Sequence, residues 1–332
     1  MRLTAQRILA EHLRDDWAKD QQSTDPSGSR FWKNIRLDLS GATLIDFNLA
    51  DGTMADANFY GAVFSGDATF GGADFRGSAR FGGATFSGDA SFAGATFRRA
   101  ARFGGTTFGG AARFGGAAFR GAASFPGAAF SGDARFGGAA FSRGVGFRRA
   151  TFGGAAVFRG ATFGGDAGFR GATFAGDAGF GEATFSGDAR FNEAAFTGGA
   201  WFGEAIFGGD AGFGGATFGG AAWFNEAAFS RGASFDAVTF TGDAWFDKVT
   251  FSRGASFDEA AFTGDAGFDG AAFSGGAWFG EATFRGGADA LHFKQTRILS
   301  ARASHVWPTG WRLAGADGGG YTVVRAKDDG GS

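Results

Sequence analysis

Cysteine is absent from this chain of 332 residues, which excludes disulfides, thiolate nucleophiles and thiolate metal sites together. Histidine is nearly absent: three His leave little material for metal binding or general-base chemistry. No apolar run is long enough to span a membrane, and the charged start argues against a secretory signal. We therefore expect a cytoplasmic protein with no catalytic, metal, cofactor or small-molecule site.

Phenylalanine and glycine, with 45 and 64 residues, are in contrast abundant. From Phe59 to Phe284 the Phe residues follow one another in steps that alternate between five and six residues. Upstream, Leu39, Leu44, Leu49 and Met54 continue the series in steps of five. Ala stands two residues before almost every one of these Phe, and the exceptions are compact: Thr106, Val145, Val238 and Val249. A sustained internal repeat of this kind predicts a solenoid.

The unit A-x-F places Ala and Phe on the same side of a short extended segment, because side chains alternate along a strand. A short turn rich in Gly follows Phe, and Gly adopts the backbone angles of tight corners at no steric cost. A disordered Phe-Gly polymer would need no such registration, and steps of five and six do not fit a helix. The pattern predicts short strands and corners whose stacked coils bury the Phe.

The segments Ala42–Asp51 and Ala57–Phe64 resemble the A-(D/N)-(L/F)-x-x units of pentapeptide-repeat proteins. Ala84–Phe92 resembles a Phe-rich subset of that family in which steps of five and six residues alternate. The resemblance implies an all-β fold, a right-handed four-sided β-helix with Leu or Phe at the centre of each side. The extra residue in every second unit departs from the commonest family pattern and leaves the corner geometry open.

The sequence is compatible with two coil lengths. Residues 229–246 and 251–268 agree at fourteen of eighteen positions, and Trp201, Trp223 and Trp245 recur at the same spacing of 22. A 22-residue coil would stack these Trp as an outward aromatic ladder and would give about ten coils between Phe59 and Phe284. A flat, two-sided 11-residue coil is the alternative, and it would place the Trp on every other rung.

The two ends differ from the repeat, so we predict caps at residues 1–36 and 290–332 around a solenoid at 37–289. Leu3, Ile8, Leu9, Leu13 and Trp17 have helical spacing, which predicts a helix over residues 3–20 with Thr4 as N-cap. This helix either covers the first coil with its apolar face or docks elsewhere, and residues 21–30 are predicted to form a loop.

After Phe284 the repeat fails, because Ala290 stands where the next Phe is due. We expect Leu291, Phe293, Ile298 and Leu299 to close the last coil. The segment after Trp307 predicts a turn and a short hairpin that serves as the C-terminal cap, and it resembles the tail of related bacterial proteins. His292 and His305 have no evident acid or base partner and are expected to be structural.

The net charge of −2 conceals a segregation of charge. Residues 76–170 contain 13 Arg and 3 Asp, whereas residues 171–289 contain 16 acidic and 5 basic residues. The candidate basic patch comprises Arg98, Arg99, Arg102, Arg113, Arg135, Arg148 and Arg149. The candidate partner-binding acidic rows comprise Glu182, Glu193, Glu204, Glu226, Asp236, Asp247, Asp258, Asp269 and Glu281.

A fold without a pocket-forming insertion and with carboxylates on convex corners indicates a non-catalytic protein. We expect a β-solenoid binding or scaffold protein that acts through charged outer faces and self-associates, basic half to acidic half. The family resemblance implies an alternative: a DNA mimic that binds and protects a bacterial type II topoisomerase, DNA gyrase, as in quinolone resistance. Direct nucleic-acid binding through the Arg-rich half is a third hypothesis.

Overall fold

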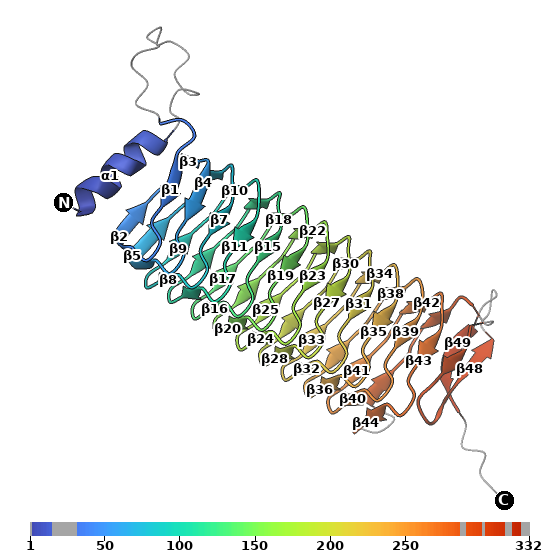
Figure 1. Ribbon diagram of the computed structural model, residues 1–332. Coiled ribbons are helices and arrows are strands. Elements are labelled where there is room, and N and C mark those ends of the chain that lie inside the picture. Colours follow the sequence, from blue (N-terminus) through green and yellow to red (C-terminus); the bar gives the residue numbers. More distant parts are fainter. Residues whose placement is uncertain (1, 15–31, 286–289, 301–302, 316–320, 327–332) are drawn as a thin grey trace, which may run out of the picture. The chain divides into compact units, whose positions relative to one another are not determined.

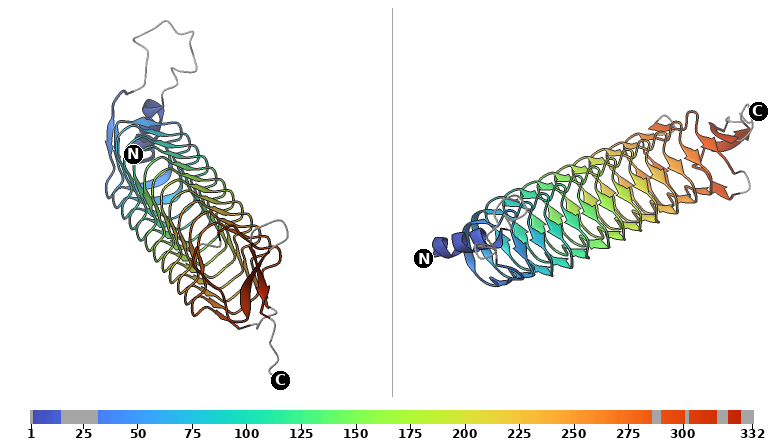
Figure 2. Two further views of the ribbon diagram at one scale, coloured as in Figure 1. Left: turned by 90° about the vertical axis from the view of Figure 1, so that its right-hand side faces the viewer. Right: turned by 90° about the horizontal axis from the view of Figure 1, so that it is seen from above.

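The computed structural model describes residues 2–14, 32–285, 290–300, 303–315 and 321–326. The chain divides into two compact units, Met1–Gly164 (unit 1) and Gly165–Ser332 (unit 2), which are described separately. Apart from the helix α1 (Arg2–Leu13), the described secondary structure consists of short strands. Within each unit these strands lie on successive stacked turns (Figures 1 and 2).

From Ala79 onward, each turn of the solenoid contains four strands. In unit 1, β7 (Ala79–Arg80), β8 (Thr85–Phe86), β9 (Ala90–Ser91) and β10 (Thr96–Phe97) complete one turn, and β11 (Ala101–Arg102) then pairs in parallel with β7. We call the four sides faces A, B, C and D in this order. Partners in register are separated by one 22-residue turn, as are Ala112 and Ala134. The 22-residue, four-sided coil is therefore confirmed, and the 11-residue alternative is wrong.

Unit 1 has the following strands. Face A contains β1 (Arg36–Asp38), β4 (Asp56–Asn58), β7, β11, β15 (Ala123–Ser124) and β19 (Val145–Gly146). Face B contains β2 (Thr43–Asn48), β5 (Val63–Thr69), β8, β12 (Thr107–Phe108), β16 (Ala129–Phe130) and β20 (Thr151–Phe152). Face C contains β9, β13 (Ala112–Arg113), β17 (Ala134–Arg135) and β21 (Ala156–Val157). Face D contains β3 (Thr53–Met54), β6 (Asp74–Phe75), β10, β14 (Ala118–Phe119), β18 (Ala140–Phe141) and β22 (Thr162–Phe163).

Unit 2 repeats this order. Face A contains β23 (Ala167–Gly168), β27 (Ala189–Arg190), β31 (Ala211–Gly212), β35 (Ala233–Ser234), β39 (Ala255–Ser256), β43 (Ala277–Trp278) and β47 (His305–Val306). Face B contains β24 (Thr173–Phe174), β28 (Ala195–Phe196), β32 (Thr217–Phe218), β36 (Thr239–Phe240), β40 (Ala261–Phe262) and β44 (Thr283–Phe284). Face C contains β25 (Ala178–Gly179), β29 (Ala200–Trp201), β33 (Ala222–Trp223), β37 (Ala244–Trp245), β41 (Ala266–Gly267) and β45 (Leu291–His292). Face D contains β26 (Thr184–Phe185), β30 (Ile206–Phe207), β34 (Ala228–Phe229), β38 (Thr250–Phe251), β42 (Ala272–Phe273) and β46 (Arg297–Ile298).

The core is a set of phenylalanine columns. Phe81 stacks on Phe103, one turn ahead, with ring centroids 4.8 Å apart and planes 1° from parallel. Across the core, Phe81 meets Phe92 edge to face at 5.3 Å. Unit 2 has the same arrangement, with Phe180 and Phe202 stacked at 4.9 Å. The compact residue at i−2 fills the space beside each ring: the hydroxyl of buried Thr106 donates to the carbonyl oxygen of Phe81.

The alternating steps correspond to two kinds of corner. Five-residue steps leave two residues at the A–B and C–D corners, and the second of them has a left-handed backbone, as at Gly94 (φ 65°). Six-residue steps leave three residues at the B–C and D–A corners. There the third residue is often Asp, and its carboxylate accepts the backbone N–H of the next turn, as Asp89 does from Ala111 at 2.8 Å. The extra residue thus changes the corner and leaves the Phe columns in register.

The first and last turns depart from the 22-residue length. Leu37 pairs with Ala57 at a spacing of 20, because the upstream steps are all of five residues. Near the C-terminus, Ala266 pairs with Leu291 at a spacing of 25. The ten or so turns predicted between Phe59 and Phe284 are confirmed, and with the flanking turns the two units contain about 12.

The helix α1 covers the start of the solenoid mainly with polar side chains. The amide of Gln6 bonds to both backbone groups of Ile45, at 3.1 Å each, and thereby imitates a neighbouring strand. Leu13 is fully buried, but Ile8 is 41% exposed, so the predicted apolar face is only partly used. The helix begins at Arg2, so Thr4 is not its N-cap and that prediction is wrong. Residues 15–30, which include Trp17 and the predicted loop, lie outside the described residues.

The C-terminal hairpin consists of β48 (Trp311–Gly315) and β49 (Tyr321–Arg325), and β49 pairs with β46. Trp307 packs against Phe279 and Phe293 at the end of the Phe columns. The predicted hairpin is confirmed. Leu291, Phe293 and Ile298 are buried, as expected, but Leu299 is 62% exposed, and its assignment to the last core layer is wrong.

Candidate binding surfaces

Glutamate in the solenoid occurs at one backbone position. The chain has seven Glu, and the six beyond Glu11 all lie second in a two-residue corner with positive φ, between 55° and 59° except for 62° at Glu226. All six are exposed: Glu182, Glu193, Glu204, Glu226, Glu259 and Glu281. In unit 1 the same position is mostly Gly. A left-handed backbone costs a residue with a Cβ about 1–2 kcal/mol, so these corners hold carboxylates against the preference of the backbone.

These glutamates form two columns on unit 2. The first column lies on the C–D corner, directly after face C, and consists of Glu182, Glu204 and Glu226 at spacings of 22 residues. Lys248 occupies the same position on the next turn, and its ammonium group pairs with Glu226 at 2.9 Å. Glu193, Glu259 and Glu281 lie on the A–B corner, on the other side of the turn. The predicted acidic rows are thus distributed over two corners of the fold.

A tryptophan ladder lies beside the first of these columns. Trp201, Trp223 and Trp245 are direct partners in register on β29, β33 and β37 of face C. Trp201 and Trp223 stack with centroids 4.8 Å apart and planes 9° from parallel, and Trp201 is 36% exposed. Trp245 leans over Gly267 of the next rung, where a Cβ would come within 2.6 Å of the indole. Aromatic faces bordered by carboxylates attract cationic groups.

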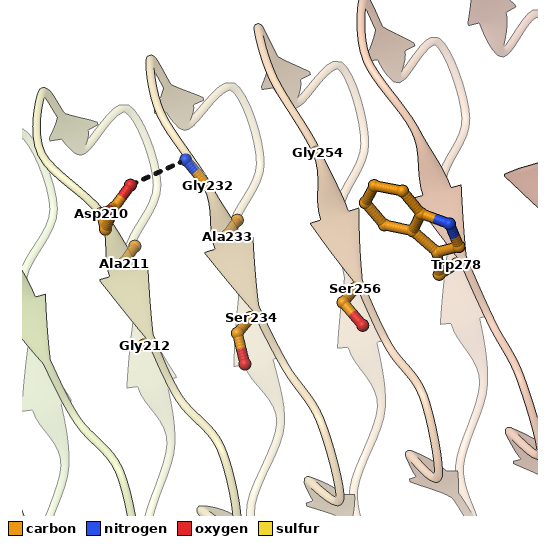
Figure 3. Close-up of a pocket in the computed structure, with 9 residues that line it drawn as sticks. All are labelled: Asp210, Ala211, Gly212, Gly232, Ala233, Ser234, Gly254, Ser256 and Trp278. Atoms are coloured by element: carbon orange, nitrogen blue, oxygen red, sulfur yellow. Dashed lines mark hydrogen bonds between the residues drawn. The ribbon is translucent and has the colours of Figure 1, made fainter. Parts of the chain in front are cut away.

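Face A of unit 2 carries an open depression of about 400 Å³ (Figure 3). Its floor is formed by Gly212, Ser234 and Ser256, which are consecutive partners in register, and Trp278 stands on the following rung. The indole of Trp278 leaves no room for a side chain at Gly254. Both serine hydroxyls donate to Asp236, which lies on the adjoining A–B corner. The arrangement offers an apolar wall and a polar floor for binding.

The predicted basic patch divides between two faces of unit 1. Arg98, Arg99 and Arg102 lie on face A or its D–A corner, and Arg148 and Arg149 follow face A on the A–B corner. Arg113 and Arg135 lie on face C, where they pair with Asp89 at 2.8 Å and Asp133 at 3.0 Å. The structure adds four arginines to the side of face A: Arg76, Arg80, Arg120 and Arg143.

The repeat itself is matched by the family model described as pentapeptide repeats, which covers successive segments between residues 53 and 289. That is well over half of the chain. The chain belongs to the pentapeptide-repeat family. No curated protein matches this chain.

Several acidic residues of this pentapeptide-repeat protein serve its backbone. Asp247 accepts the N–H of Asp269 at 3.0 Å, and Asp258 accepts that of Gly280 at 2.6 Å. Asp269 accepts the N–H of Lys294 at 2.6 Å. Partial burial raises the pKa of Asp247 above its ordinary value. These Asp, and Asp236 with its serine partners, are half-buried parts of the corners, whereas the Glu are exposed.

Arg80 and Trp278 are among the functional candidates of the pentapeptide-repeat solenoid that were missed in the sequence. Arg80 stands one turn before Arg102, and Trp278 stands one turn after Ser256 on face A. The 22-residue spacing was a signal for both, but face A could be assigned only once the coil length was known. His305 was expected to be structural, and its ring bonds to Ala277 N and Ser300 O.

In the part of the chain that the structure describes, no helix of this family member is long and apolar enough to cross a membrane. The same described residues contain no group of three or more His, Asp or Glu side chains placed to hold a metal ion.

Proposed function

We propose that this pentapeptide-repeat protein is a non-catalytic scaffold of the cytoplasm that binds a protein partner through its charged outer faces. The six exposed Glu with left-handed backbones carry the proposal. If charge served solubility alone, the outward strand positions could hold it without backbone strain. If the corner served folding alone, Gly would be the better residue. Exposed carboxylates occupy these corners instead.

Binding of a basic probe tests the acidic columns. A polyarginine peptide should bind the protein with an affinity that falls as salt is added. Replacing all six corner Glu by Gln should weaken binding at least tenfold, because the Glu are the projecting carboxylates, while the melting temperature stays within a few degrees. Unchanged affinity in a folded six-Gln variant would contradict a binding role for the corners.

The second candidate is the topoisomerase-directed DNA mimic, favoured by the regular carboxylate columns of unit 2. Residues 171–289 carry a net charge of −11. With about 4.8 Å of rise per 22-residue turn this is roughly one negative charge per 2–3 Å, against one per about 1.7 Å in DNA. Unit 2 is thus less densely charged than DNA, and unit 1 is basic, which favours the general scaffold. Relief of quinolone inhibition of gyrase supercoiling at micromolar protein would support the mimic, and no effect would remove it.

A further inference from the structure

Unit 1 carries a continuous arginine surface on face A and the adjoining D–A corner. It consists of seven exposed arginines: Arg76, Arg80, Arg98, Arg99, Arg102, Arg120 and Arg143. Arg80 and Arg102 are direct partners in register on β7 and β11, so two like charges lie side by side. Such pairs on neighbouring strands are destabilising until an opposite charge meets them. Among the described residues, Asp74 pairs with Arg76 and Arg98, each of which directly follows a strand of face D.

Unit 2 carries the complementary surface. The aromatic–acidic surface comprises the ladder Trp201, Trp223 and Trp245 on face C and the column Glu182, Glu204 and Glu226 on the C–D corner. Glu204 and Glu226 each follow a ladder Trp by three residues along the chain. A guanidinium can stack on an indole and donate to a carboxylate, so both components select arginine.

We propose that the aromatic–acidic surface of one copy of this protein binds the arginine surface of a second copy. The inference rests on the proposed function, because it names the partner of the same charged faces. Charge complementarity is one argument, and the spacing of the rungs is the other.

The two surfaces repeat with the same pitch. In unit 1 the rings of Phe81 and Phe103 stack at 4.8 Å, and in unit 2 those of Phe180 and Phe202 stack at 4.9 Å. Arginines at successive turns of one copy can therefore face Trp and Glu at successive turns of the other without losing register. A basic protein that is not built from stacked strands lacks this pitch. Each copy presents both surfaces, so the contact is heterologous and lets assemblies grow beyond dimers.

Sedimentation velocity over micromolar concentrations tests the association. In low salt the mean mass should rise with concentration, and it should return to the monomer near 0.5 M NaCl because the contacts are largely ionic. Two double variants test the two sides of the interface separately. Arg80→Gln with Arg102→Gln damages the arginine surface, and Glu182→Gln with Glu204→Gln damages the aromatic–acidic surface. Each variant alone should associate at least tenfold more weakly than the wild type.

Mixing the two variants provides the decisive result. Each retains one intact surface, so the mixture should form a one-to-one complex that cannot grow. The matched control is Arg231→Gln with Arg253→Gln, which makes the same charge change as the arginine-surface variant on the D–A corner of unit 2, outside both surfaces, and it should associate as the wild type does.

A wild type that stays monomeric, a mixture without the complex, or a control as weak as the test pair would each overturn the proposal. Retardation of duplex DNA at low salt without association of the copies would assign the arginine surface to nucleic acid and would also overturn it. A monomer that still binds polyarginine through its Glu would leave the proposed function standing, so the two failures are distinguishable.

Discussion

Each phenylalanine of the solenoid has contacts in two directions. Phe114 stacks on Phe92 and Phe136 at 4.8 and 4.7 Å, and it meets Phe103 and Phe125 edge to face at 5.5 and 5.7 Å. Offset and edge-to-face rings add to the stabilisation that burial provides. A single ring therefore supports its own turn and the turns on both sides.

Phe114→Ala should lower the free energy of unfolding by about 3–5 kcal/mol, because the ring is fully buried and its neighbours are held by their own columns. Urea denaturation followed by circular dichroism measures the change. Thr107→Ala, on the outward side of β12, is the control and should stay within about 0.5 kcal/mol. Equal losses in the two variants would mean that Phe114 does not lie in the core.

The corners with a left-handed backbone give a second prediction, in which two substitutions change the stability of the fold in opposite directions. Glu204 (φ 58°) and Gly94 (φ 65°) both lie second in a C–D corner, in different units. Glu204→Gly should stabilise the fold by about 1 kcal/mol, and Gly94→Ala should destabilise it by a similar amount. Thermal melting of both variants measures this. A loss of stability in Glu204→Gly would show that the carboxylate contributes to folding and would weaken the case for a binding role.

At the scale of the elements, two-residue strands are too short to be stable alone, and the corners connect them. In the three-residue corners an Asp carboxylate replaces a backbone acceptor for the next turn. The D–A corner of unit 2 contains such a column. Its members Asp166, Asp188 and Asp210 each accept an N–H from the following turn, at 3.1–3.2 Å. The acidic residues of these corners thus couple one turn to the next.

This coupling makes stability depend on pH. The N–H of Ala111 and the guanidinium of Arg113 hold the pKa of Asp89 below its ordinary value of 3.8. The folded-state pKa is lower than that of the unfolded chain, so Asp89 stabilises the fold above about pH 3.8. This contribution is lost as pH falls through the folded-state pKa. Asp89→Asn keeps an acceptor oxygen but cannot ionise. It should be less stable than the wild type at pH 7, and the difference should shrink as the pH is lowered toward 2. A constant difference across that range would contradict the account.

At the scale of the molecule, stability and binding both follow from the 22-residue turn. Nearest-neighbour turns supply the contacts, so a solenoid tolerates a change in the number of turns better than a change in register. The same turn length sets which outward residues form columns. Charged and aromatic side chains therefore form columns on the outside of the solenoid only where they recur every 22 residues.

Deleting residues 107–128 removes one whole turn and joins Thr106 to Ala129, so that β16 can pair with β8 as β12 does now. The shortened protein should keep its sheet spectrum and a cooperative melt. Deleting residues 107–114 should abolish cooperative melting instead, because the next Phe then falls outside its column. Circular dichroism compares the two, and equal tolerance would argue against a fixed 22-residue turn.

The sequence by itself determined the solenoid, the alternation of inward Ala and Phe, and the segregation of charge, because these depend only on local periodicity. It also predicted the aromatic ladder, since the 22-residue recurrence of Trp is visible in the chain. Only the tertiary structure decided between the 22-residue and the 11-residue coil, because both keep the Phe in phase. It also decided that Asp247 and Asp258 serve the backbone while Glu204 and Glu226 project, since a corner residue's role depends on which N–H of the next turn lies beside it. The division of the arginines between two faces followed for the same reason: neighbours along the chain lie on different sides of a turn, and neighbours in space are separated by one 22-residue turn.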